Sequence, residues 1–472
     1  MSEVRVVRRA GASIGALGLV ALLLVGCGGS SGDGAGGTDG STTTAPEKVC
    51  SPKDHGAKGD GTALDTKPLR AALDECAGGV VEVPAGTYLT GSLSPASGTT
   101  LRLAEGAVLR GTTDLDDWTE AGLIWIGGVE DVVVEGGVIE GNGPHWWDEF
   151  KAGRDRPGNI VRVDDSENVT IRDVTLRESP GWTLNIVESR HVLADGVTIR
   201  NPVLPWPESA NTDGIDIVSS SDVEIADCDI ETADDAIVLK TKEDTGPIER
   251  VEVHGCTLAG WAHGFHIGLE TWGDVRDVVF RDSTIRASQD SNPGTRYMAA
   301  VSLVSMYGAE IDDVTIEGIT VEETKTPLFV RVQGGGGYPK NQKLEPGSIS
   351  DVVVRDFEVR DASGASAFLG DPRSPLGPMT LDGITIASTE VGTAEDGAKA
   401  FDFPALELYP SPRLLGVLPA AGFYFAYVDG PVSTKDVRFT AADGEGRPDV
   451  ILEDADAVDT AGFGGDATIV TR

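Results

Sequence analysis

The sequence is poor in several features that mark common protein classes. Basic side chains are few, since 38 Lys and Arg stand against 76 Asp and Glu, and the formal net charge is −38. Proteins that bind nucleic acid without sequence preference use net positive charge to displace counterions, so this composition argues against that class. Aromatic residues make up only 6%, but the hydrophobic fraction of 40% is too high for a disordered chain.

The N-terminus lacks an apolar run long enough to span a bilayer comfortably. Residues 14–25 are apolar, follow three Arg residues and lead into Leu24-Val25-Gly26-Cys27. This pattern predicts a lipoprotein signal peptide over residues 1–26, with lipidation of Cys27. Residues 27–47, rich in Gly, Ser and Thr, are then expected to form a flexible tether.

Lipidation at Cys27 would attach the exported protein to the membrane, on the extracellular face of the cell membrane. The alternative is an ordinary signal peptide with an incidental Cys. Both readings place the folded part outside the cytoplasm.

Cysteine is also scarce, and the CxxC motif of redox catalysts is absent. Without Cys27 four cysteines remain, an even number that suits an oxidising compartment. We predict the bridges Cys50–Cys76 and Cys228–Cys256. For the second pair, a stack of reduced thiols is the open alternative.

A repeated strand pattern runs through most of the chain. The pattern is V-x-[IVF]-x-x-x-x-[ILV], in which apolar and polar residues alternate with the period of a β-strand. Asp or Asn usually precedes the first Val. The instances begin at Val132, Val169, Val192, Val223, Val251, Val278, Val314 and Val352.

Short strands at such spacings predict a solenoid. We expect an all-β fold, a single-stranded right-handed parallel β-helix over residues 48–472, which reduces the roughly three domains expected from length to one. A β-propeller is the rival, but its WD signature is absent and the spacing is irregular. Residues 66–76 have helical apolar spacing and are expected to cap the N-terminal end of the core. A monomer is expected.

Aligning the predicted strands by their inward residues brings charged side chains together. Asp213, Asp235 and His263 each lie two residues before an inward apolar residue of three successive coils, and Asp234 lies beside Asp235. Three close carboxylates repel, so at least one should keep its proton at neutral pH. One proton donor beside ionised carboxylates is what hydrolysis of a glycosidic bond requires. Solvated surface carboxylates are the alternative in so acidic a chain.

The motifs NTDG (211–214), DD (234–235) and HG (263–264) resemble the signatures of glycoside hydrolase family 28, the polygalacturonases. The resemblance extends to residues 54–91, 100–112, 141–150 and 419–430.

The resemblance implies hydrolysis of α-1,4-linked galacturonate in pectin, with inversion and with neither metal nor cofactor. Asp234 would be the general acid, and Asp213 and Asp235 would position and deprotonate the water. His263 would tune the protonation of the cluster, and Asn211 would help to bind substrate.

The sequence lacks the Arg-x-Lys with which family members usually bind the substrate carboxylate. Ser302 and Val304 stand at these positions if Val301 is the inward residue. A strongly acidic enzyme that binds a polyanion needs a local cation to offset repulsion.

Three basic residues are candidates for that cation. They are Lys240 on the outward face of its strand, Arg331 if Val330 is inward, and Arg296 in a preceding loop. His266 is expected to point outward near His263 and to line the subsite. For each of the four, a plain surface position is the alternative.

Other functions remain open at this point. The missing motif fits a hydrolase for a different glycan, such as rhamnogalacturonan. A lyase or epimerase on the same fold is a second alternative, in which Asp213, Asp234 and Asp235 would hold Ca²⁺. A third is a non-catalytic, carbohydrate-binding surface protein.

Overall fold

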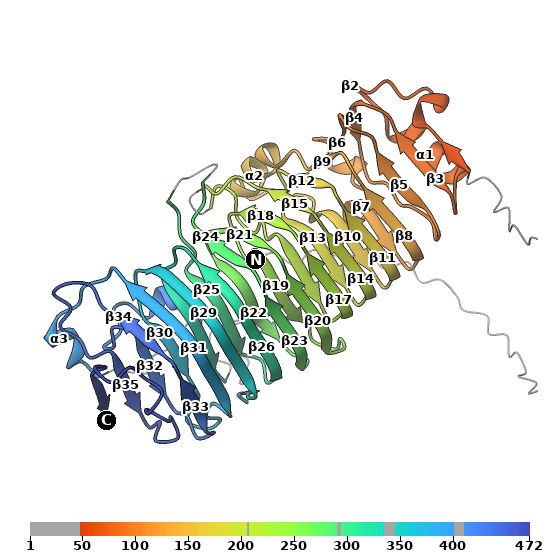
Figure 1. Cartoon of the computed structure of the whole chain (residues 1–472). Coiled ribbons are helices and arrows are strands. Elements are labelled where there is room, and N and C mark those ends of the chain that lie inside the picture. The colour runs from red at the N-terminus through yellow and green to blue at the C-terminus, as the bar shows by residue number, and fades with distance from the viewer. Residues whose placement is uncertain (1–47, 205–206, 290–293, 335–344, 401–409) are drawn as a thin grey trace, which may run out of the picture. The chain divides into compact units, whose positions relative to one another are not determined.

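The computed structural model describes residues 48–204, 207–289, 294–334, 345–400 and 410–472. The predicted signal peptide and tether, with Cys27, lie outside the described residues, so lipidation stays a prediction. Nearly all the regular structure consists of parallel strands, whose successive coils lie side by side in chain order (Figure 1). The described helical segments are η1 (Pro52–His55), α1 (Thr66–Glu75), η2 (Leu115–Asp117), α2 (Gly143–Lys151), α3 (Ala394–Gly397) and η4 (Pro412–Leu414).

The strands form two parallel sheets. One sheet, which carries the site described below, contains β7 (Gly122–Gly127), β10 (Asn159–Asp164), β13 (Trp182–Val187), β16 (Ile215–Val218), β19 (Ile237–Thr241), β22 (His263–Thr271), β25 (Ala299–Ser305), β27 (Thr326–Val332), β30 (Ser366–Leu369), β32 (Phe423–Ala426), β35 (Val450–Glu453) and β36 (Ile469–Thr471).

The second sheet contains 24 of the described strands. Its strands are β1 (Val49–Cys50), β2 (Asp60–Leu64), β3 (Val80–Val83), β4 (Gly86–Thr90), β5 (Thr100–Leu103), β6 (Ala107–Gly111), β8 (Glu130–Glu135), β9 (Val138–Glu140), β11 (Glu167–Arg172), β12 (Thr175–Arg177), β14 (Arg190–Asp195), β15 (Thr198–Arg200), β17 (Ser221–Ala226), β18 (Asp229–Thr232), β20 (Ile248–His254), β21 (Thr257–Gly260), β23 (Val275–Arg281), β24 (Thr284–Arg286), β26 (Glu310–Val321), β28 (Ser348–Ile349), β29 (Val352–Ala362), β31 (Met379–Ser388), β33 (Val432–Lys435) and β34 (Arg438–Thr440).

The first valine of every repeat forms one continuous column. Each of the first seven pairs in register with the repeat valine of the next coil, from Val132 to Val352, and all eight are buried. Burial of apolar surface stabilises such a stack by about 25 cal/mol for each Å² removed from water. The predicted parallel β-helix is therefore confirmed.

The Asp or Asn before the repeat valine has a structural role. The residue at this position adopts a left-handed backbone with φ between 49° and 60° in all eight repeats: Asp131, Asn168, His191, Asp222, Arg250, Asp277, Asp313 and Asp351. Asp and Asn accept this conformation better than most side chains. At the next bend Asp and Gly alternate from coil to coil, again with positive φ: Asp173, Gly196, Asp227, Gly255, Asp282, Gly318, Asp356 and Gly383.

Helix α1 forms where the sequence predicts it. Its apolar face, Leu69, Ala72 and Leu73, is buried in the main core. That α1 seals the end of the core stays a prediction. Directly after the helix, Cys76 is bonded to Cys50 with the Cα atoms 5.9 Å apart, which confirms the first predicted disulfide.

The second predicted disulfide is wrong. Cys228 and Cys256 are buried free thiols in adjacent coils, each directly before residues that pair in register. Their Sγ atoms each lie 3.3 Å from a backbone carbonyl oxygen, of Ala226 and His254 respectively. The two thiols thus occupy one column as predicted, in the reduced arrangement.

Among the described residues, no helix combines the length and the apolar composition needed to cross a bilayer.

Candidate active site

The strand register assembles the predicted cluster. Ile215 in β16 pairs with Ile237 in β19, and Ile237 pairs with Phe265 in β22. Asp213, Asp235 and His263, each two residues earlier, therefore lie at the same edge of three adjacent strands. One oxygen from each of Asp213, Asp234 and Asp235 lies within 4.8 Å of the others.

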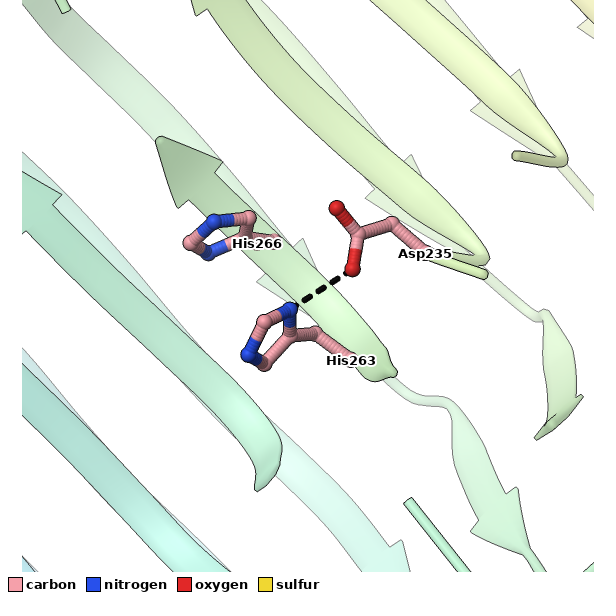
Figure 2. Close-up of side chains that lie close together, drawn as sticks. All are labelled: Asp235, His263 and His266. Atoms are coloured by element: carbon pink, nitrogen blue, oxygen red, sulfur yellow. Dashed lines mark hydrogen bonds and ion pairs between the residues drawn. The ribbon is translucent and has the colours of Figure 1, made fainter. Parts of the chain in front are cut away.

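Asp235 and His263 form the shortest polar contact in the cluster. His263 Nδ1 lies 2.6 Å from Asp235 Oδ1, and both side chains are buried (Figure 2). Burial alone would raise the pKa of Asp235, but the charge and hydrogen bond of His263 lower it well below its usual range. Asp235 is therefore ionised. His263 Nε2 is buried and has no hydrogen-bond partner among the described residues.

Asp234 is in the opposite protonation state. Burial and the repulsion from Asp213 and Asp235 raise its pKa well above its usual range. The side chain is partly exposed, and its Oδ2 accepts a hydrogen bond from the Asn211 backbone N–H at 3.2 Å. Two neighbouring carboxyls with widely separated pKa values are the arrangement that divides proton donor from ionised partner.

Lys240 is not the outward, substrate-facing cation that the sequence predicts. It is only 6% exposed, and its Nζ donates to Asp213 Oδ2 at 2.9 Å and to Asp216 Oδ1 at 2.7 Å. Despite its burial, these two carboxylates raise the pKa of Lys240 well above its usual range. The ammonium also lies 4.1 Å from the ring centroid of Trp182. Lys240 thus serves as the counter-ion of the cluster.

Asp213 holds an intermediate position in the cluster. Burial raises its pKa, the Lys240 charge opposes this, and Asp235 adds repulsion, so the net shift is upward. Burial likewise raises the pKa of Asp216 well above its usual range, against the attraction of Lys240. Sequence reasoning missed Asp216, although it lies one residue beyond the inward Ile215.

The strand register predicted for Arg331 is wrong. Val301 pairs with Leu328 rather than Val330, so Arg331 pairs with Val304, the Lys position of the missing motif. Arg331 is 5% exposed, and its Nη1 donates to the Gly370 carbonyl at 3.4 Å. The sequence alternates with period two here, so a shift of two residues leaves the same side chains facing inward.

Arg296 and His266 also differ from their predicted places. Arg296 donates to both carboxylate oxygens of Asp361, at 3.0 and 2.7 Å, so its charge is already paired. His266 is 1% exposed, with Nδ1 3.1 Å from the Ser302 carbonyl oxygen. Its ring stacks on His263 with centroids 4.3 Å apart (Figure 2). Burial lowers the pKa of His266 to about 3, so the ring is neutral.

Arg156, which sequence reasoning missed, lies beside the catalytic carboxylates. Its Nη2 donates to the Ala210 carbonyl at 2.9 Å and to Asn211 Oδ1 at 3.4 Å. The guanidinium also stacks 4.0 Å from the centroid of the Phe150 ring. Burial lowers the pKa of Arg156 to about 10, and attraction to Asp213 and Asp234 opposes that shift. No local motif marks this residue.

Asn211 accepts a hydrogen bond from Arg156 at its Oδ1, and its predicted contact with substrate stays a prediction. It adopts φ 56°, a left-handed conformation that Asn tolerates, and this directs its N–H to Asp234. Arg156 and Asn211 therefore position the general-acid candidate through one continuous chain of hydrogen bonds.

Two groups in the site have the spacing to hold a cation. They are Asp213 with Asp234 and Asp235, and Asp235 with His263 and His266. The first group already has a cation, since Lys240 binds Asp213. In the second group, Nδ1 of His263 already contacts Asp235 and Nδ1 of His266 contacts the Ser302 carbonyl oxygen.

Comparison with known proteins decides the family. Residues 76–400 match glycosyl hydrolases family 28. The chain belongs to this family. A probable polygalacturonase of Vitis vinifera is 28% identical over 372 residues, covering 71% of this chain and 73% of the relative. An exopolygalacturonase of Zea mays is 26% identical over 356 residues, covering 70% and 82%.

The solved exopolygalacturonase of Thermotoga maritima shares the fold, with a TM-score of 0.65 and 17% identity over 84% of this chain and 93% of that one. This likeness supports the right-handed parallel β-helix. The family match and the polygalacturonase relatives identify the chain as a glycoside hydrolase.

The contact between His263 and Asp235 generates a pH prediction. In His263→Asn the pKa of Asp235 rises, because its attracting charge is gone. The acidic limb of the activity profile, below which Asp235 takes up a proton, should move up by about one pH unit or more. The profile of kcat against pH measures this. His191→Asn, an exposed site on β14, serves as the control, and an unmoved acidic limb would contradict the assignment.

Arg156 generates a second prediction. Arg156→Ala frees Asn211 and removes a cation near Asp234, so the pKa of Asp234 should rise further. The basic limb, where Asp234 loses its proton, should then move to higher pH, and kcat should fall about tenfold. Arg156→Lys keeps the charge and should leave the basic limb in place. Arg154→Ala is the neighbouring control, and a basic limb that stays put in Arg156→Ala would rule out this role.

Proposed function

We propose that the protein hydrolyses α-1,4-galacturonosyl linkages in pectic polysaccharide, with inversion at the anomeric carbon. The observation that carries the proposal is the division of roles between two adjacent carboxyls, a protonated Asp234 and an ionised Asp235. Asp234 donates its proton to the leaving glycosidic oxygen. Asp235 and Asp213 bind a water molecule and take up its proton as it attacks the anomeric carbon.

The partners of the two base candidates support this assignment. Asp235 is bonded to His263, and Asp213 to Lys240. A carboxylate whose lone pairs and charge are engaged in this way is a weaker nucleophile, whereas it can still hold and orient a water. His263 Nε2, without a partner among the described residues, is available to a substrate hydroxyl or to that water.

A retaining reaction is the second candidate, and one observation favours it. One oxygen of each of the three carboxyls lies within 4.8 Å of the others, and a short separation of the two carboxyl groups is typical of retaining enzymes. The two mechanisms differ in the first product, since inversion of an α-linkage releases the β-anomer. Proton NMR of the product within the first minutes of reaction distinguishes them.

Asp234→Asn tests the proposal directly. On polygalacturonate, kcat should fall by about 10²–10⁴ with KM nearly unchanged, because the general acid is lost while binding is kept. Reducing ends released per minute measure this, and Asp244→Asn, an exposed loop position, is the control. Full activity of Asp234→Asn would sink the hydrolase assignment of this site.

A lyase is distinguished in the same assay. A lyase forms products with an unsaturated, ultraviolet-absorbing end and stops when a chelator removes Ca²⁺. Under the proposal, the products do not absorb and chelator leaves the rate unchanged. Assays on rhamnogalacturonan and on neutral glycans in parallel identify the preferred sugar.

We propose further that the protein is exported and anchored by a lipid at Cys27. The signal-peptide pattern of residues 1–26 supports this, and the Cys50–Cys76 disulfide fits an oxidising compartment. Labelled palmitate should be incorporated into the full chain expressed in an exporting bacterium, and Cys27→Ala should abolish labelling and release the protein from the membrane fraction. Equal labelling of the variant would refute the anchor.

A further inference from the structure

Beside the catalytic strands lies a cavity that the proposed mechanism does not use. It has a volume of about 230 Å³, and Met298, Lys325, Glu390, Arg413 and Leu418 are among the residues that line it. This volume lies below the roughly 300–1,000 Å³ of pockets that hold drug-sized ligands, and so suits a single sugar unit.

The cavity lies next to the active site along the sheet. Met298 donates its N–H to the carbonyls of Trp261 and Ala262, which directly precede His263. Thr326, which follows Lys325, pairs with Ala299 of β25, and Ala299 pairs with His263. Since adjacent strands are about 4.8 Å apart, the backbone at Lys325 is about 10 Å from that at His263.

The cavity is positive, although the whole chain carries −38. Lys325 and Arg413 are both exposed, and neither forms an ion pair with a carboxylate of the described ranges. The Arg413 guanidinium lies 5.9 Å from the ring centroid of Trp261. Glu390 is the acidic residue of the lining, and it is bonded to Arg447 Nη2 at 2.9 Å, an arginine that it shares with Glu445.

Most other basic residues of the structure are already engaged. Arg296, two residues before Met298, is paired with Asp361, and Lys240 is paired with Asp213 and Asp216. Lys325 and Arg413, which form no ion pair within the described part of the chain, therefore give this cavity the positive charge that an anionic substrate needs.

We propose that Lys325 and Arg413 bind the carboxylate of a second uronate unit, in the same glycan chain that is cleaved at Asp234. The inference rests on the proposed function and names its substrate class, an oligouronate with a free carboxylate beyond the scissile bond. Arginine binds a carboxylate through two parallel hydrogen bonds, and lysine adds a point charge. The pair supplies the positive charge that Ser302 and Val304 lack, from the residue before β27 and from η4.

Binding to a catalytically inactive protein tests the cavity separately from the reaction. In the Asp234→Asn background, calorimetry measures the Kd of a defined oligogalacturonate and of its methyl ester. Adding Lys325→Ala and Arg413→Ala should weaken binding of the acid about tenfold or more, reduce its salt dependence, and leave binding of the ester nearly unchanged. Lys67→Ala with Arg438→Ala, two exposed cations elsewhere on the β-helix, is the matched control.

The outcomes separate the cavity from the proposed function. Unchanged affinity for the acid, or equal loss for acid and ester, overturns the cavity assignment while hydrolysis of polygalacturonate by the wild type still upholds the function. A wild type that hydrolyses no galacturonan, together with acid-specific binding lost in the double variant, refutes the function and supports the cavity.

Discussion

The in-register pairing of successive strands is the constraint on which the rest of this structure depends. Each coil must place its backbone donors and acceptors opposite those of the coil before, at a spacing of about 4.8 Å. A side chain is thereby fixed above its equivalent in the previous coil. The column from Val132 to Val352 and the row of Asp213, Asp235 and His263 arise from the same pairing, on different sheets.

Such close stacking makes the carboxylates repel one another, and the site reduces this repulsion more for some carboxyls than for others. Lys240 shares its single charge between Asp213 and Asp216, and His263 stabilises the charge on Asp235. Asp234 receives a single backbone N–H, so the repulsion falls chiefly on it. The distribution of counter-ions, rather than the identity of the carboxyls, decides which of them keeps its proton.

These two levels also explain what the sequence could predict. The sequence predicts both the repeat and the row of Asp213, Asp235 and His263. Strand register fixes these two features, and the spacing of residues in the sequence follows the register. The predicted strand of Lys240 is right, but its predicted role in binding substrate is wrong. Its long side chain reaches Asp213, and residue spacing does not show where the end of a long side chain lies. Arg156 comes from a loop, where no periodicity applies. The register predicted for Arg331 is wrong because apolar and polar residues alternate with period two, and a shift of two residues leaves this pattern unchanged.

The acidity of the chain has a partly structural origin. Asp occupies the left-handed bend before most repeat valines and alternates with Gly at the next bend, so most added coils bring at least one acidic residue at these bends. On the outer faces, Arg residues bridge Glu between coils, as Arg102 and Arg172 do at Glu135. This leaves few cations unpaired.

A polyanion approaching the cleft responds mainly to nearby charge, because the Debye length is about 8 Å at physiological ionic strength. A net charge of −38 spread over more than ten coils is therefore compatible with an anionic substrate, provided that the free cations lie at the cleft. Lys325 and Arg413 meet that condition, whereas basic residues paired on the outer faces do not.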